Sequence, residues 1–212
     1  MIRTEHVDIL PTFGCLTAQP CDHKFGFPEP DDFGRDILLS QHGVKPSKVY
    51  WIESGVVKKV CLQADGSELI TGLRTTGWIV GAEAALVPAR QEPVAITATK
   101  CTLRPMPLET FVKAYQEIQT LSRHVTNMLA LELALRLRAN SSVRHTTTRT
   151  RLEHFIDECT AVSRTLPEGV PALRLKQTEI AQIVGSTPEH LSRLLHQMEL
   201  EGLIDKTKPP FM

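Results

Sequence analysis

Short apolar runs separated by glycine-containing turns fill the middle of the chain. One run covers residues 49–52, and a second over 56–62 leads to Asp65-Gly66, a dipeptide that favours a tight β-hairpin. Apolar and polar residues alternate over 94–99, as they do in a half-buried strand. Strands of this length and spacing predict an antiparallel barrel or jelly roll over about residues 37–106. The residues before it are rich in proline, glycine and aspartate and predict no firm element.

A helical period replaces the strand period after Pro107. Residues 108–139 contain no proline or glycine, and apolar residues recur there at steps of three and four. This near-heptad repeat predicts one long helix that pairs with the same helix of a second chain. The interface that we expect consists of Leu121, Val125, Met128 and Leu135. Glu132 lies near this seam and departs from a strict coiled coil, so packing of the helix on its own barrel is the alternative.

The last third of the chain predicts three helices. Residues 148–162 place Leu152, Phe155, Ile156 and Cys159 on one helical face, and two shorter helices follow over 177–184 and 188–200. Gly185 suits the left-handed backbone of a tight turn between them. Thr187 is a good N-cap, and Pro188 fits the first helical position. Two short helices joined in this way predict a helix-turn-helix.

Composition narrows the class of protein. The chain is 42% hydrophobic and 23% charged, which is ordinary for a globular domain, and no apolar run reaches the roughly 20 residues of a membrane helix. We see no apolar signal core at the N-terminus, and the five cysteines are scattered, so we expect a cytoplasmic protein with free thiols. The 24 basic and 24 acidic residues cancel, but the stretch from Arg136 to Arg151 holds only basic charges. Such a stretch, Arg149 included, can neutralise phosphates or can be a solvated helix end.

The outward face of the last helix carries candidate chemistry for reading DNA. Besides Thr187, it offers Glu189, His190, Ser192 and Arg193 near its N-terminus. A carboxylate can accept a hydrogen bond from cytosine N4, and an arginine can donate two to guanine O6 and N7. The alternative is an exposed intrahelical Glu–Arg pair, which stabilises a helix by about 0.3–0.5 kcal/mol.

These features together resemble the CRP/FNR superfamily of bacterial transcription regulators. The resemblance covers VYWIESGVVKKVCLQADGSELITGLRTTGWIVGAE, residues 108–139 and residues 174–204. It implies an α+β fold with a cyclic-nucleotide-binding-type β-roll over 1–107, a dimerisation helix over 108–142 and a winged helix-turn-helix over 143–212. It also implies a homodimer that binds a double-stranded DNA operator and RNA polymerase. Only DKTKPPFM follows Ile204, so the wing is short or incomplete.

The recognition helix resembles the FNR-like branch in particular. Glu189, Ser192 and Arg193 match its E-x-x-S-R pattern, and Pro188 stands where the CRP branch carries an arginine. The resemblance therefore implies an inverted repeat with TTGA-like half-sites.

The effector, if there is one, is unknown from the sequence. By resemblance the pocket would include Gly81, Glu83, Arg90 and Met128, but Pro93 falls where cyclic AMP-binding members place the arginine that neutralises the phosphate. An uncompensated buried phosphate is costly, so we do not expect cyclic AMP to bind. An iron–sulfur cluster needs about four thiolates within reach, and Cys15 and Cys21 make one plausible pair only. Haem on a histidine (His23, His42 or His124) is not favoured either.

Two other classes of function are alternatives to a DNA-binding regulator. A metal-dependent jelly-roll enzyme needs clustered histidine and carboxylate ligands, and residues 49–106 contain no histidine, so we expect no enzyme and no metal. A regulatory protein that binds a cyclic nucleotide or another small ligand without touching DNA is the alternative. The face of Glu189, Ser192 and Arg193 argues against it.

Overall fold

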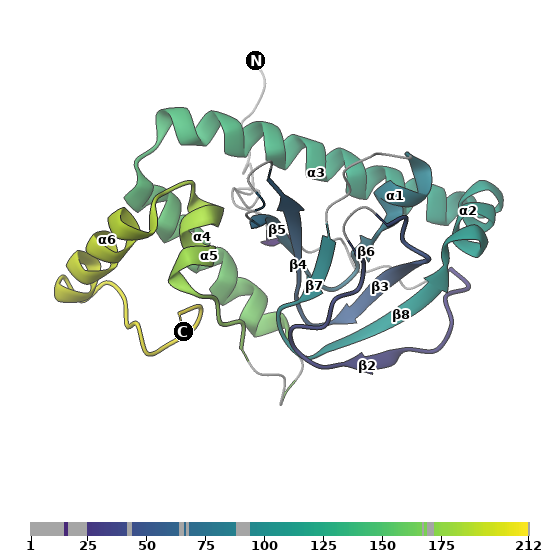
Figure 1. Ribbon diagram of the computed structural model, residues 1–212, viewed down its shortest axis with the longest axis horizontal. Helices are drawn as coiled ribbons and strands as arrows, with labels where there is room; N and C mark the ends of the chain where they lie inside the picture. The colour runs from purple at the N-terminus through teal and green to yellow at the C-terminus, as the bar shows by residue number, and fades with distance from the viewer. Residues whose placement is uncertain are drawn as a thin grey trace, which may run out of the picture.

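Two four-stranded sheets form the N-terminal half of the molecule. The computed structural model describes residues 15–16, 25–41, 44–63, 66, 68–87, 94–166, 168 and 172–211. One sheet has the strand order β1-β5-β4-β7, and the other β2-β8-β3-β6 (Figure 1). The strands are β1 (Cys15–Leu16), β2 (Asp31–Phe33), β3 (Lys48–Ser54), β4 (Val57–Leu62), β5 (Glu68–Arg74), β6 (Ile79–Val80), β7 (Val94–Thr97) and β8 (Cys101–Pro107). The predicted β-roll is confirmed.

The hairpin between β4 and β5 forms as the sequence predicts. Val57 pairs with Arg74 and Leu62 with Glu68 in antiparallel register, and Gly66 in the turn has a φ of 83°. The longest partner of β3 was not predicted as a separate strand: β8 pairs with it from Lys48↔Pro107 onward. Its two prolines, which normally disfavour a central strand, hid it from the sequence pattern.

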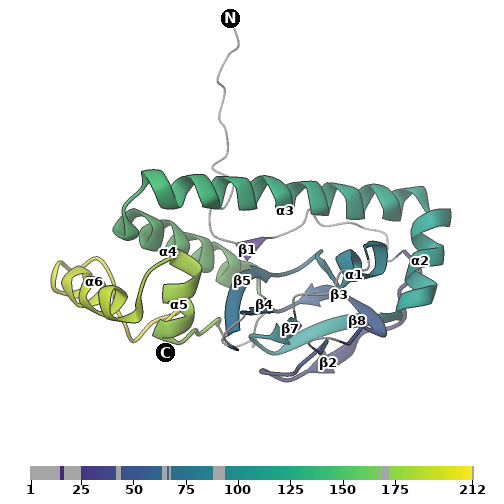
Figure 2. The ribbon, with the colours of Figure 1, turned by 45° about the horizontal axis from the view of Figure 1, so that its top comes forward.

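The predicted single helix after Pro107 is broken. Helix α2 (Leu108–Glu117) ends at Ile118, whose φ of −101° and ψ of 98° are extended, and α3 (Gln119–His145) then runs for 27 residues, about 40 Å. α3 continues past residue 142, where the sequence suggested a boundary. Figure 2 shows α3 lying across the barrel, with the short helix α1 (Ala82–Leu86) beneath it.

One face of α3 packs against the barrel of the same chain. Leu121 and Val125 are fully buried in a single chain, and Met128 and Leu135 are 2% and 4% exposed. They belong to the hydrophobic core that contains Trp51 and other residues of the barrel. The sequence assigned these four side chains to a dimer interface, but the barrel already covers them. This face of α3 therefore packs on the barrel of its own chain, which was the alternative prediction for the helix.

The opposite face of α3 is apolar and exposed. Leu133 and Leu137 are 60% and 62% exposed, and Thr126 and Ala130 precede them on the same side at steps of four, three and four residues. We call Thr126, Ala130, Leu133 and Leu137 the α3 seam. Its spacing is that of a heptad repeat.

Three helices form the C-terminal part: α4 (Thr148–Thr165), α5 (Gln177–Val184) and α6 (Pro188–Leu200). The bounds of α5 and α6 are those predicted, and α4 is three residues longer. After α6, the described residues up to Phe211 form no hairpin; Phe211 is buried and makes one isolated bridge to Leu175. Within these described residues, the structure therefore shows no wing hairpin.

The C-terminal part docks on the barrel through α5. Lys58 of β4 and Glu179 of α5 form an ion pair of 2.8 Å. The side-chain amide of Gln182 accepts a hydrogen bond from Ile70 N at 3.1 Å and donates one to Glu68 O at 2.9 Å. Both ribbon views show α5 beside β5 (Figures 1 and 2).

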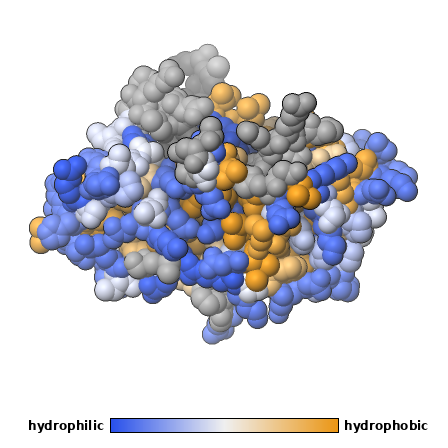
Figure 3. All heavy atoms as spheres, viewed as in Figure 1, coloured by the Kyte–Doolittle hydropathy of each residue, from blue (hydrophilic) through white to orange (hydrophobic). Residues whose placement is uncertain are grey.

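The barrel and the C-terminal helices differ in the polarity of the surface seen in one view. In Figure 3 apolar side chains gather over the barrel, whereas the helical C-terminal part is mostly hydrophilic. Among the described residues, no helix combines the length and the apolar character needed to cross a membrane.

Candidate nucleic-acid interface

The turn between α5 and α6 is fixed by local capping. Gly185 ends α5 in the left-handed region, with φ 66° and ψ 54°. The Thr187 Oγ1 accepts a hydrogen bond from the backbone N–H of His190 at 3.2 Å, and Pro188 occupies the first turn of α6. These are the roles that the sequence assigned to Gly185, Thr187 and Pro188. They set the direction in which α6 leaves the turn.

Helix α6 buries one face and exposes the other. Leu191, Leu194, Leu195 and Met198 are buried as predicted. Glu189, His190, Ser192 and Arg193 are all exposed near the N-terminus of the helix. Within the part of the chain that the structure describes, Arg193 and Glu189 are in no ion pair, with each other or with another residue. Their donors and acceptor are free to meet a ligand.

Arg151 holds this turn from behind, a role that the sequence analysis missed. Its side chain donates hydrogen bonds to Val184 O at 2.7 Å and to Gly185 O at 3.1 Å. It also donates to Thr146 O at 2.7 Å and to Thr148 Oγ1 at 3.2 Å. Arg151 is buried, and burial lowers the pKa of its guanidinium. It therefore joins the connection between α3 and α4 to the turn before α6, and its donors are taken up by groups of the protein itself.

Arg149 is separate from the exposed face of α6. Its Nε donates to Glu153 Oε1 at 3.1 Å, and its Nη2 donates to Glu201 Oε2 at 2.6 Å. These hydrogen bonds to Glu201 and Glu153 raise the pKa of the guanidinium. Glu201 is the C-cap of α6, about 12 Å along the helix from Arg193. Arg149 is thus balanced by two carboxylates in this structure, and its predicted contact with a DNA phosphate stays a prediction.

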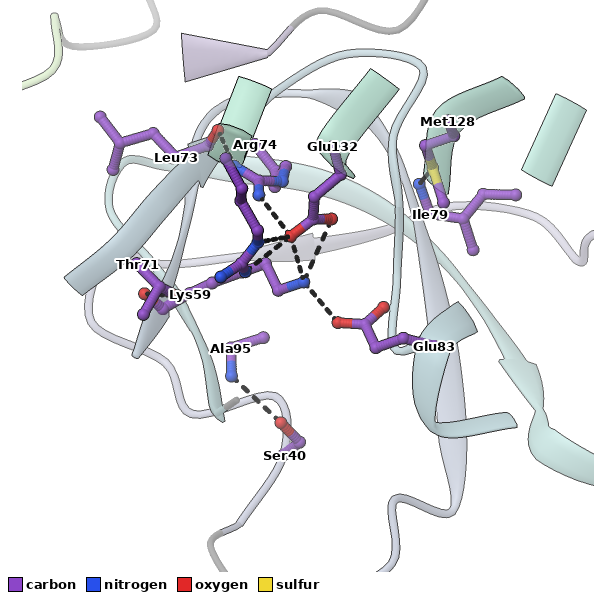
Figure 4. Close-up of polar contacts among 11 residues, drawn as sticks. Ser40, Lys59, Thr71, Leu73, Arg74, Ile79, Glu83, Ala95, Met128 and Glu132 are labelled. Carbon is purple, nitrogen blue, oxygen red and sulfur yellow. Dashed lines mark hydrogen bonds and ion pairs between the residues drawn. The ribbon is translucent and has the colours of Figure 1, made fainter. Parts of the chain in front are cut away.

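Three of the four residues predicted for an effector pocket, Gly81, Glu83 and Met128, lie where the barrel meets α3. Gly81 starts α1, Glu83 contacts Lys59 Nζ at 2.5 Å, and Met128 Sδ accepts a hydrogen bond from Ile79 N at 3.3 Å (Figure 4). Arg90 and Pro93 lie outside the described residues, as do His23, His42, Cys21 and the side chain of Cys15. His124 is engaged: its Nε2 lies 2.9 Å from Gly77 O, and its ring stacks on Trp51.

A cluster of charged side chains fills the space beside Glu83. Lys59 Nζ and Arg74 Nη2 lie 3.2 and 2.9 Å from the same oxygen, Oε1 of Glu132 on α3, and Arg136 Nη2 lies 2.8 Å from it. Burial alone would raise the pKa of Glu132, but Arg74, Lys59 and Arg136 outweigh it and hold that pKa at about 2. The one signal in the sequence was Glu132 itself, an acid within an apolar stripe.

Two family models match the chain. A Crp-like helix-turn-helix domain matches residues 150–210, and a cyclic nucleotide-binding domain matches residues 32–117. The CRP-like protein Clp from Xanthomonas campestris pv. campestris is 25% identical over 169 residues, which cover 74% of this chain and 71% of Clp.

Solved structures share this fold over most of the chain. The c-di-GMP responsive global regulator CLP of Xanthomonas campestris has a TM-score of 0.62 at 19% identity, covering 85% of this chain and 91% of its own. FixK2 from Bradyrhizobium japonicum has a TM-score of 0.64 at 21% identity, covering 85% and 90%. A CRP-family regulator from Thermus thermophilus has a TM-score of 0.66 at 20% identity, covering 82% and 87%. At such identities these likenesses establish the fold, and with both family models the chain belongs to the CRP/FNR superfamily of transcription regulators.

Proposed function

We propose that this regulator binds an inverted-repeat operator as a homodimer and reads TTGA-like half-sites with the N-terminal turns of α6. The observation that carries the proposal is that Glu189 and Arg193 are both exposed on α6, whose start is capped by Thr187, and that neither forms an ion pair within the described residues. Arg193 is suited to guanine O6 and N7, and Glu189 to cytosine N4, so both side chains can read one G·C pair in the major groove. Ser192 and His190 lie on the same exposed face and supply further polar contacts.

The α3 seam supports the homodimer. Two exposed leucines at heptad spacing on a helix of about 40 Å offer a surface that a second copy of the same helix can cover. Thr126 and Ala130 are small, so two backbones can approach closely at that end. The proposed interface is therefore the α3 seam, not the stripe of Leu121, Val125, Met128 and Leu135, which the barrel occupies.

A dimer fixes the form of the operator. Two copies of α6 related by a twofold axis meet successive major grooves about 34 Å, or roughly 10 base pairs, apart. We place the protein in the cytoplasm with its DNA and with RNA polymerase as the partner that the bound dimer recruits or blocks, and we assign it no catalytic activity.

Selection of bound sequences from random DNA tests this proposal. The full chain should enrich an inverted repeat with TTGA-like half-sites, at a salt concentration stated with the result because phosphate contacts make affinity salt-dependent. Enrichment of a sequence without twofold symmetry, or no enrichment at all, would overturn the proposal.

A further inference from the structure

Two buried cations face one another inside the barrel. Lys59 of β4 and Arg74 of β5 are 3% and 2% exposed. Arg74 is positioned from several sides: its guanidinium lies over the ring of Trp78, 4.8 Å from the centroid, and its Nη1 donates to Leu73 O at 2.8 Å. A Cβ at Gly72 would lie 2.5 Å from that Nη1, so the absence of a side chain there makes room for the guanidinium. The barrel thus holds two cations in a built arrangement.

Their counter-charge comes from another element. Glu132 Oε1 accepts hydrogen bonds from Lys59 Nζ at 3.2 Å and from Arg74 Nη2 at 2.9 Å, and Arg136 completes the set one helical turn further along α3. Glu83 of α1 contacts Lys59 from the opposite side. Figure 4 shows the carboxylate of Glu132 entering between the two cations from the helix. Burial of such charges is tolerated only because each is paired.

We propose that Lys59 and Arg74 form an anion site inside the barrel and that Glu132 is its built-in ligand, so that α3 is held against the barrel without a bound effector. The domain matches a cyclic nucleotide-binding family, whose ligand is an anion. Here both cations already share a carboxylate of the chain itself. An incoming phosphate would have to displace Glu132 and leave that carboxylate buried without its partners, which is strongly unfavourable.

Removing the carboxylate and supplying it again from solution tests the site directly. Glu132→Ala should lower the thermal unfolding midpoint of the full chain, and acetate at constant ionic strength should restore several degrees of it, whereas chloride should not. Glu117→Ala is the matched control, because Glu117 is an exposed glutamate just before α3. If acetate restores none of the stability that Glu132→Ala has lost, Lys59 and Arg74 do not form an anion site.

Two further measurements test whether Glu132 keeps α3 packed against the barrel. In Glu132→Gln, which keeps the side-chain volume, backbone amides of α3 between Val125 and Leu135 should exchange with solvent at least about tenfold faster than in Glu117→Gln. Millimolar cyclic AMP should leave the unfolding midpoint of the unmodified chain unchanged. Equal exchange in the two variants, or a midpoint that rises with cyclic AMP, would overturn the proposal.

The consequence for DNA rests on the proposed function. Glu132→Gln should bind the selected operator at least about tenfold more weakly than the unmodified chain. Operator binding that is equal in both proteins contradicts the inference alone, whereas an unmodified chain that selects no operator contradicts the proposed function. The acetate and exchange measurements use no DNA and stand in either case.

Discussion

Arginine serves three purposes in this protein, and the groups around each guanidinium decide which. Arg74 is buried against Trp78 and neutralises Glu132. Arg151 is buried among carbonyl oxygens and holds a turn in place. Arg193 is exposed on α6 with no partner in the described part of the chain. Because a guanidinium keeps its charge at every ordinary pH, burial of Arg74 and Arg151 requires acceptors, whereas Arg193 remains available for a base.

Replacement of Arg193 should therefore alter recognition without altering the fold. Arg193→Ala should lose about 1–3 kcal/mol of binding free energy per half-site and relax the preference at one base pair. A binding assay on operators that vary at each position measures both effects. Arg164→Ala, another exposed arginine of the same domain, should leave the preference unchanged. An unaltered preference in Arg193→Ala would mean that another residue reads the base.

Acid should weaken the fold through Glu132. Its pKa is about 2 in the folded chain, against an ordinary value of 4.5, so its contribution is complete above pH 4.5 and is lost as the pH falls toward 2. The difference corresponds to about 3 kcal/mol of unfolding free energy. Urea unfolding at about pH 5 and pH 3 should show a smaller loss for Glu132→Gln than for the unmodified chain. Equal losses in both proteins would contradict this assignment.

At the scale of elements, the two faces of α3 have different environments. One face completes the core of the barrel, and the other, the α3 seam, is exposed. The sequence showed both ridges but could not tell which of them the barrel would cover, because a heptad pattern looks the same whichever surface it packs against.

Charges on the two faces should have different effects. Leu133→Glu should give a folded monomer with little operator affinity, since the dimer doubles the contacts to DNA. Val125→Glu should instead unfold the chain, because it buries a charge in the core. Analytical ultracentrifugation and circular dichroism separate these results. A Leu133→Glu protein that remains dimeric would place the interface elsewhere.

The turn before α6 should depend on Arg151. Arg151→Ala leaves carbonyls of Val184 and Gly185 without their donor and should cost about 2–3 kcal/mol of unfolding free energy. Arg151→Lys should not restore the lost stability, because an ammonium group cannot reproduce the planar set of donors of a guanidinium. Denaturant unfolding measures both losses, and full stability in Arg151→Lys would refute the need for that geometry.

The sequence predicted features that depend on neighbouring residues more accurately than features that depend on residues far apart in the chain. The bounds of α5 and α6 were predicted because Gly185, Thr187 and Pro188 determine them locally. The break at Ile118 and the pairing of β8 with β3 depend on contacts with distant residues, which no local pattern records.

Of the candidate site residues, some could be predicted from the sequence, whereas the partners of others could not. Glu189 and Arg193 could be found because their face of α6 follows from helical periodicity. The partners of Arg149 include Glu201, 52 residues away, and those of Glu132 include Lys59, 73 residues away. Pairings over such separations appear only in the folded chain.

At the scale of the whole molecule, barrel and helix-turn-helix share one hydrophobic cluster. Val56, Leu73 and Ala98 of the barrel pack with residues of α4, α5 and α6. The Lys58–Glu179 ion pair and the two hydrogen bonds of Gln182 surround this contact. Helix α6 is therefore held against the barrel through this shared cluster.

Loss of the Gln182 side chain should weaken the contact between the barrel and the C-terminal helices. Gln182→Ala should lower the free energy of unfolding by about 1–2 kcal/mol, because two hydrogen bonds to the backbone of β5 are lost. In calorimetry, the barrel and the C-terminal helices of this variant should unfold in two separate transitions. Gln177→Ala on the same helix is the control. A single, unshifted transition in Gln182→Ala would show that the hydrophobic cluster alone joins them.

The short connection between α3 and α4 has a consequence for the genome. Only Thr146 and Thr147 separate the two helices. One base pair inserted between half-sites moves a half-site by about 3.4 Å and turns it by roughly 35° about the duplex axis. A two-residue tether, with Arg151 bonded across it, cannot follow such a displacement. Genuine binding sites should therefore share a single spacer length, and a genomic search with that length fixed should identify the regulated promoters, whereas TTGA alone recurs too often to do so.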